Sequence, residues 1–472
     1  MLFNSFHYVA FFLLLTIACD LIRHGKSQQI LLLFASYYFY WISSSFYLLG
    51  LIFLSWLNFS CSRALYSELN PLRKKRILVM CLLGNLGMLG FFKYANFALH
   101  NLNLAFRALQ IDVELGPLAV VLPIGISFYT FQGMSYTLDI YMGRFKPISS
   151  FKTLALYVAF FPQLVAGPIV RAAVLIPQLE RRIQVKWDNF KMGVTLILYG
   201  LIKKICIADN LAGVVSQTFQ QGLTQDTMLI FFGILAFAIQ IYCDFSGYTD
   251  IAIGSARVLG LSFPDNFAHP YWSRNISEFW QRWHISLSTW LRDYLYIPLG
   301  GNRRGKPRQM IYLMITMTLG GLWHGAAWHF VLWGAYHGML LVVHKGAIQP
   351  LNLLKHRFWT PLKILFTLYL TCIGWLIFII PDLDALGFYL KKMLLWEYST
   401  SGLVNLANLH PLGVWLVPAF WIVHLISHHA GNLALVIGRL RSFSVWMAAI
   451  GVGLVLLYLL AGGQRSFIYF QF

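Results

Sequence analysis

Long apolar runs recur from one end of the chain to the other, and short polar stretches separate most of them. A helix needs about 20 such residues to cross the hydrocarbon core of a membrane. The pattern therefore predicts an all-α membrane protein, a polytopic helical bundle of about 10 to 12 transmembrane helices with one or two re-entrant segments. The run from Phe6 to Ile22 ends in Arg23-His24-Gly25-Lys26 without a small-residue cleavage site, so we interpret it as the first retained span.

The stretch from Gln28 to Phe59 is too long for one span and has three serines near its middle, which predicts a helical hairpin. The segment Leu122–Gln132 is apolar but carries Pro, Gly and Gln, so we expect a break that is buried or lines a cavity. Without a clean repeat or a long linker, the simplest organisation is a single integral domain, 1–472. Further spans are predicted at Ile77–Phe92, Leu154–Val165, Met192–Ala208, Met228–Tyr242 and Ile251–Leu261, with apolar runs resuming at Met310, Trp328, Pro361, Pro411 and Val445.

Composition supports this class of protein, since 58% of the residues are hydrophobic and only 11% are charged. The 36 Lys and Arg outnumber the 17 Asp and Glu, a net charge of +19. The basic residues lie in short loops between apolar runs, as at Arg73–Arg76, where they act as orientation signals. We therefore expect a lipid bilayer and no nucleic acid as partner, with the N-terminus outside the cytoplasm.

Polar residues inside apolar sequence are the candidates for function, because burying them costs free energy. Asp244 and Asp250 lie in one such stretch, where they serve helix breaking and inter-helix hydrogen bonding or, alternatively, catalysis. On a helix, Glu278 and Arg282 lie one turn apart and can pair. An aromatic and apolar stripe at helical spacing follows on the same predicted helix, formed by Trp283, Leu287, Trp290 and Tyr294.

Two histidines stand out in these polar, Trp-rich surroundings, His284 and His324. His324 could be a metal ligand, a structural hydrogen-bonding group or a proton-transfer group, and His284 could simply be a satisfied core group. His329 and His337 would point in other directions from the same helix as His324, and the six scattered cysteines show no ligand spacing, so no metal site is predicted. No nucleophile elbow, P-loop or dinucleotide fingerprint is present. A transporter that relays protons through these groups is the alternative of another class.

At these residues the sequence resembles the membrane-bound O-acyltransferase family, in its bacterial alginate O-acetyltransferase branch. The matching stretches follow the family's order from about Leu118 to Lys345, the expected catalytic core (118–345). They are Leu122–Gln132, Phe161-Pro-Gln-Leu-Val-Ala-Gly-Pro-Ile-Val170, Tyr242-Cys-Asp-Phe-Ser-Gly-Tyr-Thr-Asp250, Phe279-Trp-Gln-Arg-Trp-His284 and Gly321-Leu-Trp-His-Gly325.

The resemblance implies helices around a central tunnel, His324 as the catalytic base and His284 as a second active-site residue. It implies acetyl-CoA as donor, used from the cytoplasmic side of the bacterial inner membrane, and a hydroxyl of an exported, alginate-like polysaccharide as acceptor. Arg303 and Arg304 could meet the coenzyme A phosphates, or could serve only as a topological anchor. D-alanyl transfer to teichoic acid and peptidoglycan O-acetylation are the alternatives within the enzyme class.

The C-terminal tail Arg465-Ser-Phe-Ile-Tyr-Phe-Gln-Phe472 is typical of the same branch. We hypothesise that Tyr469 accepts the acyl group and yields it to an extracytoplasmic or lipid-anchored acetyltransferase partner. The alternative for this tail is an interfacial aromatic anchor.

Overall fold

The computed structural model describes residues 1, 3–165, 167–219, 226–349, 357–395, 401–463, 465, 467 and 468. Throughout this described part the regular elements are helices. Five helical stretches in it are long and apolar enough to cross a membrane, and Phe6–Leu21 and Phe443–Leu459 are shorter apolar helices. The predicted all-α membrane class is therefore confirmed, while the central tunnel stays a prediction. The five stretches are Gly25–Ser67, Pro71–Ala108, Thr227–Val258, Thr360–Ile379 and Pro411–Ala430.

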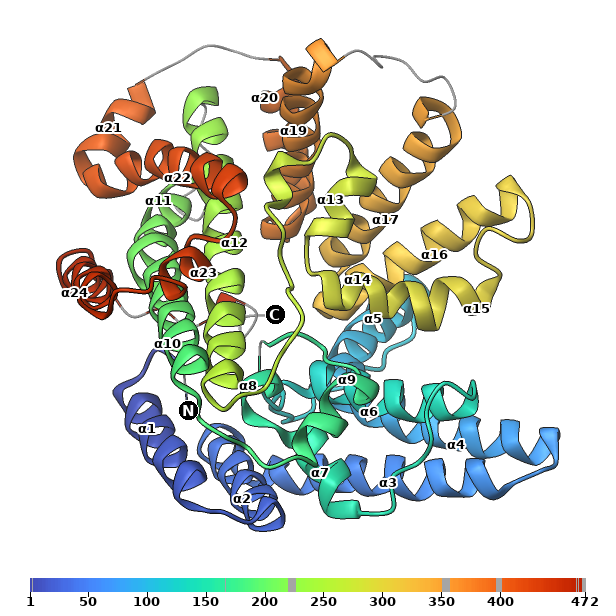
Figure 1. The fold of residues 1–472 in the computed structure, drawn as a ribbon. Helices are drawn as coiled ribbons and strands as arrows, with labels where there is room; N and C mark the ends of the chain where they lie inside the picture. Colours follow the sequence, from blue (N-terminus) through green and yellow to red (C-terminus); the bar gives the residue numbers. More distant parts are fainter. Residues whose placement is uncertain are drawn as a thin grey trace. The chain divides into compact units, whose positions relative to one another are not determined.

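The chain forms two compact units, and the first comprises Met1–Phe190 with Ser255–Pro264. Its helices carry the blue and green colours of Figure 1. They are α1 (Phe6–Leu21), α2 (Gly25–Ser44), α3 (Leu48–Ser67), α4 (Pro71–Leu89), α5 (Ala95–Ala108), α6 (Ile126–Tyr141), α7 (Phe151–Ala159), α8 (Phe161–Leu164) and α9 (Ala172–Leu179).

A buried polar network joins three helices of this unit. Thr137 of α6 donates to Asn58 Oδ1 of α3 over 2.8 Å, and Asn58 Nδ2 donates to Asn85 Oδ1 of α4 over 3.0 Å. All three side chains are buried. Side-chain hydrogen bonds of this kind hold helices together where lipid offers no hydrophobic driving force.

The break expected near Leu122–Gln132 is present, because α6 begins only after Gly125 in the left-handed conformation (φ 76°). A Cβ there would meet the Leu164 carbonyl oxygen at 2.3 Å, so both the conformation and the space require glycine. Within Gln28–Phe59, where a helical hairpin was predicted, the chain divides into α2 and α3 at Ser45 (φ 35°), and the hairpin arrangement of the two helices stays a prediction. The single span predicted at Leu154–Val165 is wrong, since α7 and α8 are separate helices of nine and four residues.

The second unit comprises Lys191–Gly254 and Asp265–Phe472. Its helices are α10 (Trp187–Leu201), α11 (Asp209–Phe219), α12 (Thr227–Val258), α13 (Ile276–Arg282), α14 (Ile285–Leu291), α15 (Ile297–Leu299), α16 (Lys306–His324), α17 (Trp328–Val343), α19 (Thr360–Ile379), α20 (Leu383–Leu395), α21 (Ser401–Leu409), α22 (Pro411–Ala430), α23 (Leu433–Gly438) and α24 (Phe443–Leu459). A π-helical segment, η3 (Ile202–Ala208), joins α10 to α11.

One uninterrupted helix, α12, runs through the region where the sequence predicted two spans. The helix break expected around Asp244 and Asp250 is therefore wrong, whereas their inter-helix bonding is confirmed: Asp250 pairs with Lys203 at 2.7 Å and Asp244 with Lys204 at 2.6 Å. Glycines make this possible, because a Cβ on Gly200 would lie 2.4 Å from the carbonyl oxygen of Gly247. The close backbone approach brings the η3 lysines to the α12 carboxylates.

Helices α16 and α17 lie side by side and form a hairpin (Figure 1). A Cβ on Gly321 would lie 2.2 Å from the carbonyl oxygen of Phe330, so a small residue is needed where the two helices meet. The helix ends at His324 and the next begins at Trp328. Placing His324, His329 and His337 on one helix was therefore wrong, and the turn between the helices sets the direction of His324.

Candidate active site

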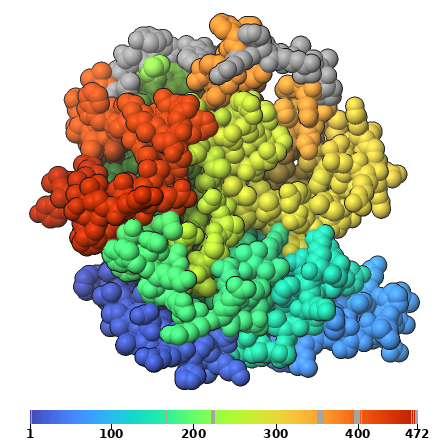
Figure 2. Space-filling model, viewed as in Figure 1, coloured from blue at the N-terminus to red at the C-terminus, as the bar shows by residue number. Residues whose placement is uncertain are grey.

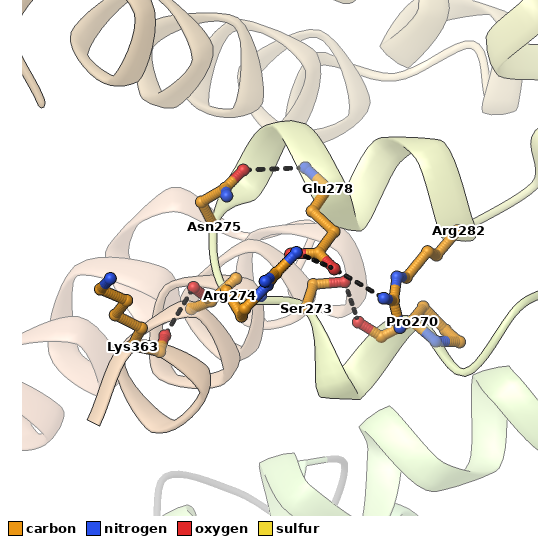
Figure 3. A network of polar contacts seen from close by, with 8 residues as sticks. Pro270, Ser273, Arg274, Asn275, Glu278, Arg282 and Lys363 are labelled. Carbon is orange, nitrogen blue, oxygen red and sulfur yellow. Dashed lines mark hydrogen bonds and ion pairs between the residues drawn. The ribbon is translucent and has the colours of Figure 1, made fainter. Parts of the chain in front are cut away.

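The polar segment before α14 is fixed by one carboxylate, that of Glu278. Asn275 caps α13 by accepting the Glu278 backbone N–H over 2.9 Å. The Glu278 carboxylate accepts from Arg274 Nε at 3.0 Å and from Arg282 at 2.6 Å, and Figure 3 shows the two arginines around it. Partial burial acts to raise the pKa of Glu278, but the bonds and charges of the arginines outweigh it and the pKa is lowered. The predicted Glu278–Arg282 pair is confirmed.

Helix α13 stops at Arg282, and His284 adopts the left-handed conformation (φ 44°, ψ 55°) before α14 begins. The predicted stripe on one continuous helix is therefore wrong, because Trp283 and Trp290 belong to different elements. A left-handed conformation at a residue other than glycine costs of order 1 kcal/mol and is frequent at functional sites. This break gives the sequence Trp283-His284 a direction that a regular helix would not allow.

The ring of His284 is fully buried. Its Nδ1 lies 3.3 Å from Asn266 Oδ1, which also accepts from the backbone N–H of Ser286 at 3.1 Å and from its hydroxyl at 2.9 Å. Since this oxygen can only accept, the contact is a hydrogen bond in the tautomer that carries its proton on Nδ1. Burial lowers the pKa of His284 to about 3, so the imidazole is neutral near pH 7.

His324 is the last residue of α16, and aromatic rings surround it. Its ring centroid lies 5.1 Å from that of Trp323, 5.0 Å from that of Trp333 and 5.8 Å from that of Phe378. All three contacts are edge to face, and the His324 side chain is 4% exposed. The imidazole is thus held in one orientation by packing.

A cavity of about 430 Å³ reaches His324. Helices α13, α14, α16 and α17 supply most of its wall, and in the space-filling view the yellow-green surface of the 275–296 segment meets the yellow surface of α16 (Figure 2). Apolar and aromatic side chains dominate the lining, as is usual for small-molecule sites. The polar or charged lining residues include Ser277, Gln281, Ser288, Thr289, Arg292, Asn302, Thr316 and Lys345.

The two histidines singled out from the sequence lie close together but not in the same position. His324 lines the cavity, whereas His284 does not. Trp323 lies between them, with its ring centroid 6.0 Å from that of His284 and 5.1 Å from that of His324. Arg303 and Arg304 are exposed in the turn before α16, next to the lining residue Asn302 but outside the lining itself. Tyr469 lies outside the described residues.

Sequence reasoning missed two cations of the cavity wall, Arg292 and Lys345. Arg292 follows α14 and pairs with its neighbour Asp293 at 2.8 Å, with 58% of its side chain exposed. Lys345 follows α17 in the π-helical segment His344–Ile348. Arg292 lies within the predicted helix of the aromatic stripe and Lys345 follows the apolar run that begins at Trp328, and only the fold shows that they share a wall with His324.

The described part of the chain thus offers the oriented imidazole of His324 on the wall of a cavity that Arg292 and Lys345 also line. The family model for MBOAT, the membrane-bound O-acyltransferase family, matches residues 144–380, which include every residue of that cavity's wall. The chain is also 41% identical to a probable alginate O-acetylase of Pseudomonas putida over 384 residues, covering 80% of this chain and 77% of the relative.

The chain belongs to the membrane-bound O-acyltransferase family.

Other relatives of this O-acyltransferase are named for other acceptors, peptidoglycan and teichoic acid. A peptidoglycan O-acetyltransferase of Helicobacter pylori is 35% identical over 69% of this chain and 66% of its own. A teichoic acid D-alanyltransferase of Bacillus subtilis is 29% identical over 54% of this chain and 68% of its own. The family and these relatives identify an enzyme, an O-acyltransferase that uses an acyl donor. The sequence prediction of an enzyme is confirmed over the transporter alternative.

Proposed function

We propose that this O-acyltransferase moves an acetyl group from cytoplasmic acetyl-CoA to hydroxyl groups of an exported, alginate-like cell-envelope polysaccharide. The observation that carries the proposal is the position of the His324 ring on the wall of a cavity of about 430 Å³. A ring packed on all sides could not have reached a substrate. The proposed location of the protein is the bacterial inner membrane. The proposed architecture is one integral domain around a central tunnel.

His324 acts as general base in this proposal. Its unprotonated ring nitrogen takes the proton of the acceptor hydroxyl while the hydroxyl oxygen attacks the thioester carbonyl carbon. The carbon–oxygen bond forms, the carbon–sulfur bond breaks, and the leaving thiolate takes the proton back from the imidazolium. The ring is neutral again after one cycle, and no covalent intermediate on the histidine is needed.

The donor would bind through its phosphates. Arg292 and Lys345 line the cavity, and the exposed Arg303 and Arg304 adjoin its lining residue Asn302. Arginine is well suited to phosphate because its guanidinium offers several parallel donors. We propose that the four cations attract the coenzyme A end while the acetyl thioester lies near His324.

His284 is proposed as a second active-site residue that acts through Trp323. Its ring does not line the cavity, but it lies against the indole that also contacts His324. Asn266 in turn orients His284. We therefore assign it a positioning role, in which it sets the Trp323 ring and, through it, the His324 ring.

The acceptor is proposed from the names of the relatives. Several probable alginate O-acetylases match this chain, among them that of Pseudomonas aeruginosa at 39% identity over 87% of this chain and 78% of its own. An extracytoplasmic or lipid-anchored acetyltransferase would then complete delivery to the polymer. Tyr469 is proposed as the relay: its hydroxyl is the one that attacks the thioester with His324 as base, and the tyrosyl ester so formed is broken when a hydroxyl of the partner takes the acetyl group and the phenol is restored. Normal acetylation of polymer by a Tyr469→Phe variant would disprove the relay.

The proposal as a whole is tested with membranes that contain the full chain and acetyl-CoA labelled in its acetyl group. Label should enter exported polysaccharide and be released by mild base, as expected of an ester. Label found only in peptidoglycan would show that the acceptor is wrong. No transfer from acetyl-CoA, with transfer from another acyl donor, would show that the donor is wrong.

A further inference from the structure

Two buried lysines of η3, Lys203 and Lys204, meet two carboxylates of α12, and the two pairs differ. Lys203 Nζ lies 2.7 Å from Asp250 Oδ2. Lys204 Nζ lies 2.6 Å from Asp244 Oδ1 and 2.8 Å from Asp209 Oδ1. Lys204, Asp209 and Asp244 thus place one cation against two carboxylates, with side chains at most 3% exposed. Two buried carboxylates that share one lysine need further donors or cations, and the charge of Arg465 also acts on Asp209.

The further donor comes from the far end of the chain. Asp244 Oδ2 accepts the backbone N–H of Ile468 at 2.7 Å, although 224 residues separate the two. Ile468 is buried, and Phe467 is fully buried. The ring of Phe467 lies 4.3 Å from that of Tyr248 on the same helix as Asp244. The segment at 467 and 468 is therefore held inside the second unit rather than lying on its surface.

The bound segment lies near the candidate active site. The Phe245 ring centroid is 6.0 Å from that of Phe467 on one side and 4.7 Å from that of His284 on the other. One ring thus separates Phe467 from His284, and Trp323 continues the contact to His324. The carboxylate that binds the tail and the phenylalanine that contacts His284 are neighbours on α12.

We propose that Asp244, paired with Lys204, is the anchor of the C-terminal segment at Phe467 and Ile468, and that it holds this segment near His284 for acyl transfer. A purely structural link between η3 and α12 would not need two carboxylates around one lysine. Lys203 and Asp250 already make that link with one cation and one carboxylate. Asp244 instead uses its second oxygen for a backbone group of the C-terminal segment. In this sense it is a positioning residue rather than a catalytic one.

The first test removes either side of the bond and measures release of the tail. Asp244→Asn weakens the acceptor, and Ile468→Pro removes the donating N–H, whereas Ile468→Val keeps it. Trypsin is added to the purified full chain, and cleavage after Arg465 is followed by mass spectrometry, because it removes residues 466–472. Cleavage should be about tenfold faster in the first two variants, as expected for loss of a hydrogen bond to a charged group. It should remain slow in Ile468→Val and in the matched control Asp250→Asn, which disrupts the neighbouring ion pair without touching the tail.

The second test is a double-mutant cycle on acyl transfer, and this arm alone rests on the proposed function. Asp244→Asn and Ile468→Pro should each reduce kcat by about tenfold, and the double variant should lose no more than either alone. Losses that multiply, or a tail that stays protected in both single variants, would overturn the anchor. If His324→Ala retains activity while the tail is released as expected, the proposed function fails and the anchor stands. If His324→Ala is inactive while the tail stays protected in Asp244→Asn, the proposed function stands and the anchor fails.

Discussion

A Cβ atom on Gly325 would lie 2.0 Å from Cε2 of Phe330, so the ring of Phe330 occupies the space that a side chain would need. The backbone of Gly325 is extended (φ −160°, ψ 154°), a conformation open to any residue. Glycine is therefore required here for space alone. Because Gly325 follows His324 directly, a side chain at this position would press on the Phe330 ring at the end of α16.

We predict that Gly325→Ala reduces acyl transfer by about a hundredfold, since a displacement of about 1 Å in a catalytic group can cost that much. The protein should still be recovered from membranes at near wild-type level, because the clash lies in a turn. Phe330→Leu in the same chain should restore part of the activity by freeing the space. Initial rates of the single and double variants measure this, and a fully active Gly325→Ala would contradict it.

His324→Ala is expected to abolish polymer acylation while the protein remains inserted and stable. Removal of a general base reduces rates by roughly 10²- to 10⁴-fold. His329→Ala is the matched control, since this histidine lies in the first turn of α17 and does not line the cavity. Acylated polymer is quantified in cells that produce equal amounts of each variant. Full acylation with His324→Ala would remove this residue from the mechanism.

Arg292→Ala and Lys345→Ala should each raise the KM for acetyl-CoA roughly fivefold and change kcat less, because a partly exposed charge contact contributes about 1 kcal/mol. Dephospho-coenzyme A thioesters should lose this sensitivity if either cation meets the 3′-phosphate. The comparison pair is Arg303→Ala and Arg304→Ala, whose side chains are exposed outside the cavity lining. A larger KM effect from this second pair would place donor entry at the turn before α16.

The sequence allowed prediction of what local pattern and lipid solvent dictate, namely the apolar helices, the Gly125 break and the polar, Trp-rich region around the two histidines. Prediction from the sequence failed where residues distant in the chain determine whether a helix continues or breaks. Two carboxylates in an apolar run indicated a break, yet α12 continues because Lys203 and Lys204 neutralise them. Helical spacing through Trp283 and Trp290 predicted one helix, but Asn266 supports a left-handed His284 between two short ones.

The lowered pKa of His284 should make the folded protein less stable at acidic pH. Burial lowers that pKa to about 3 in the folded protein, against about 6.5 in an unfolded chain. The contribution of this group to stability is therefore complete above about pH 6.5 and is lost as the pH falls toward 3, by up to about 1.4 kcal/mol per pH unit.

Thermal unfolding of the detergent-solubilised protein between pH 7.5 and 5 should show a steeper fall for the wild type than for His284→Gln. His429→Gln, which changes an exposed imidazole on α22, should keep the wild-type slope. Equal slopes for the wild type and His284→Gln would mean that His284 takes up its proton in the folded protein. In that case the neutral ring that we assign to the positioning of Trp323 and His324 would be wrong.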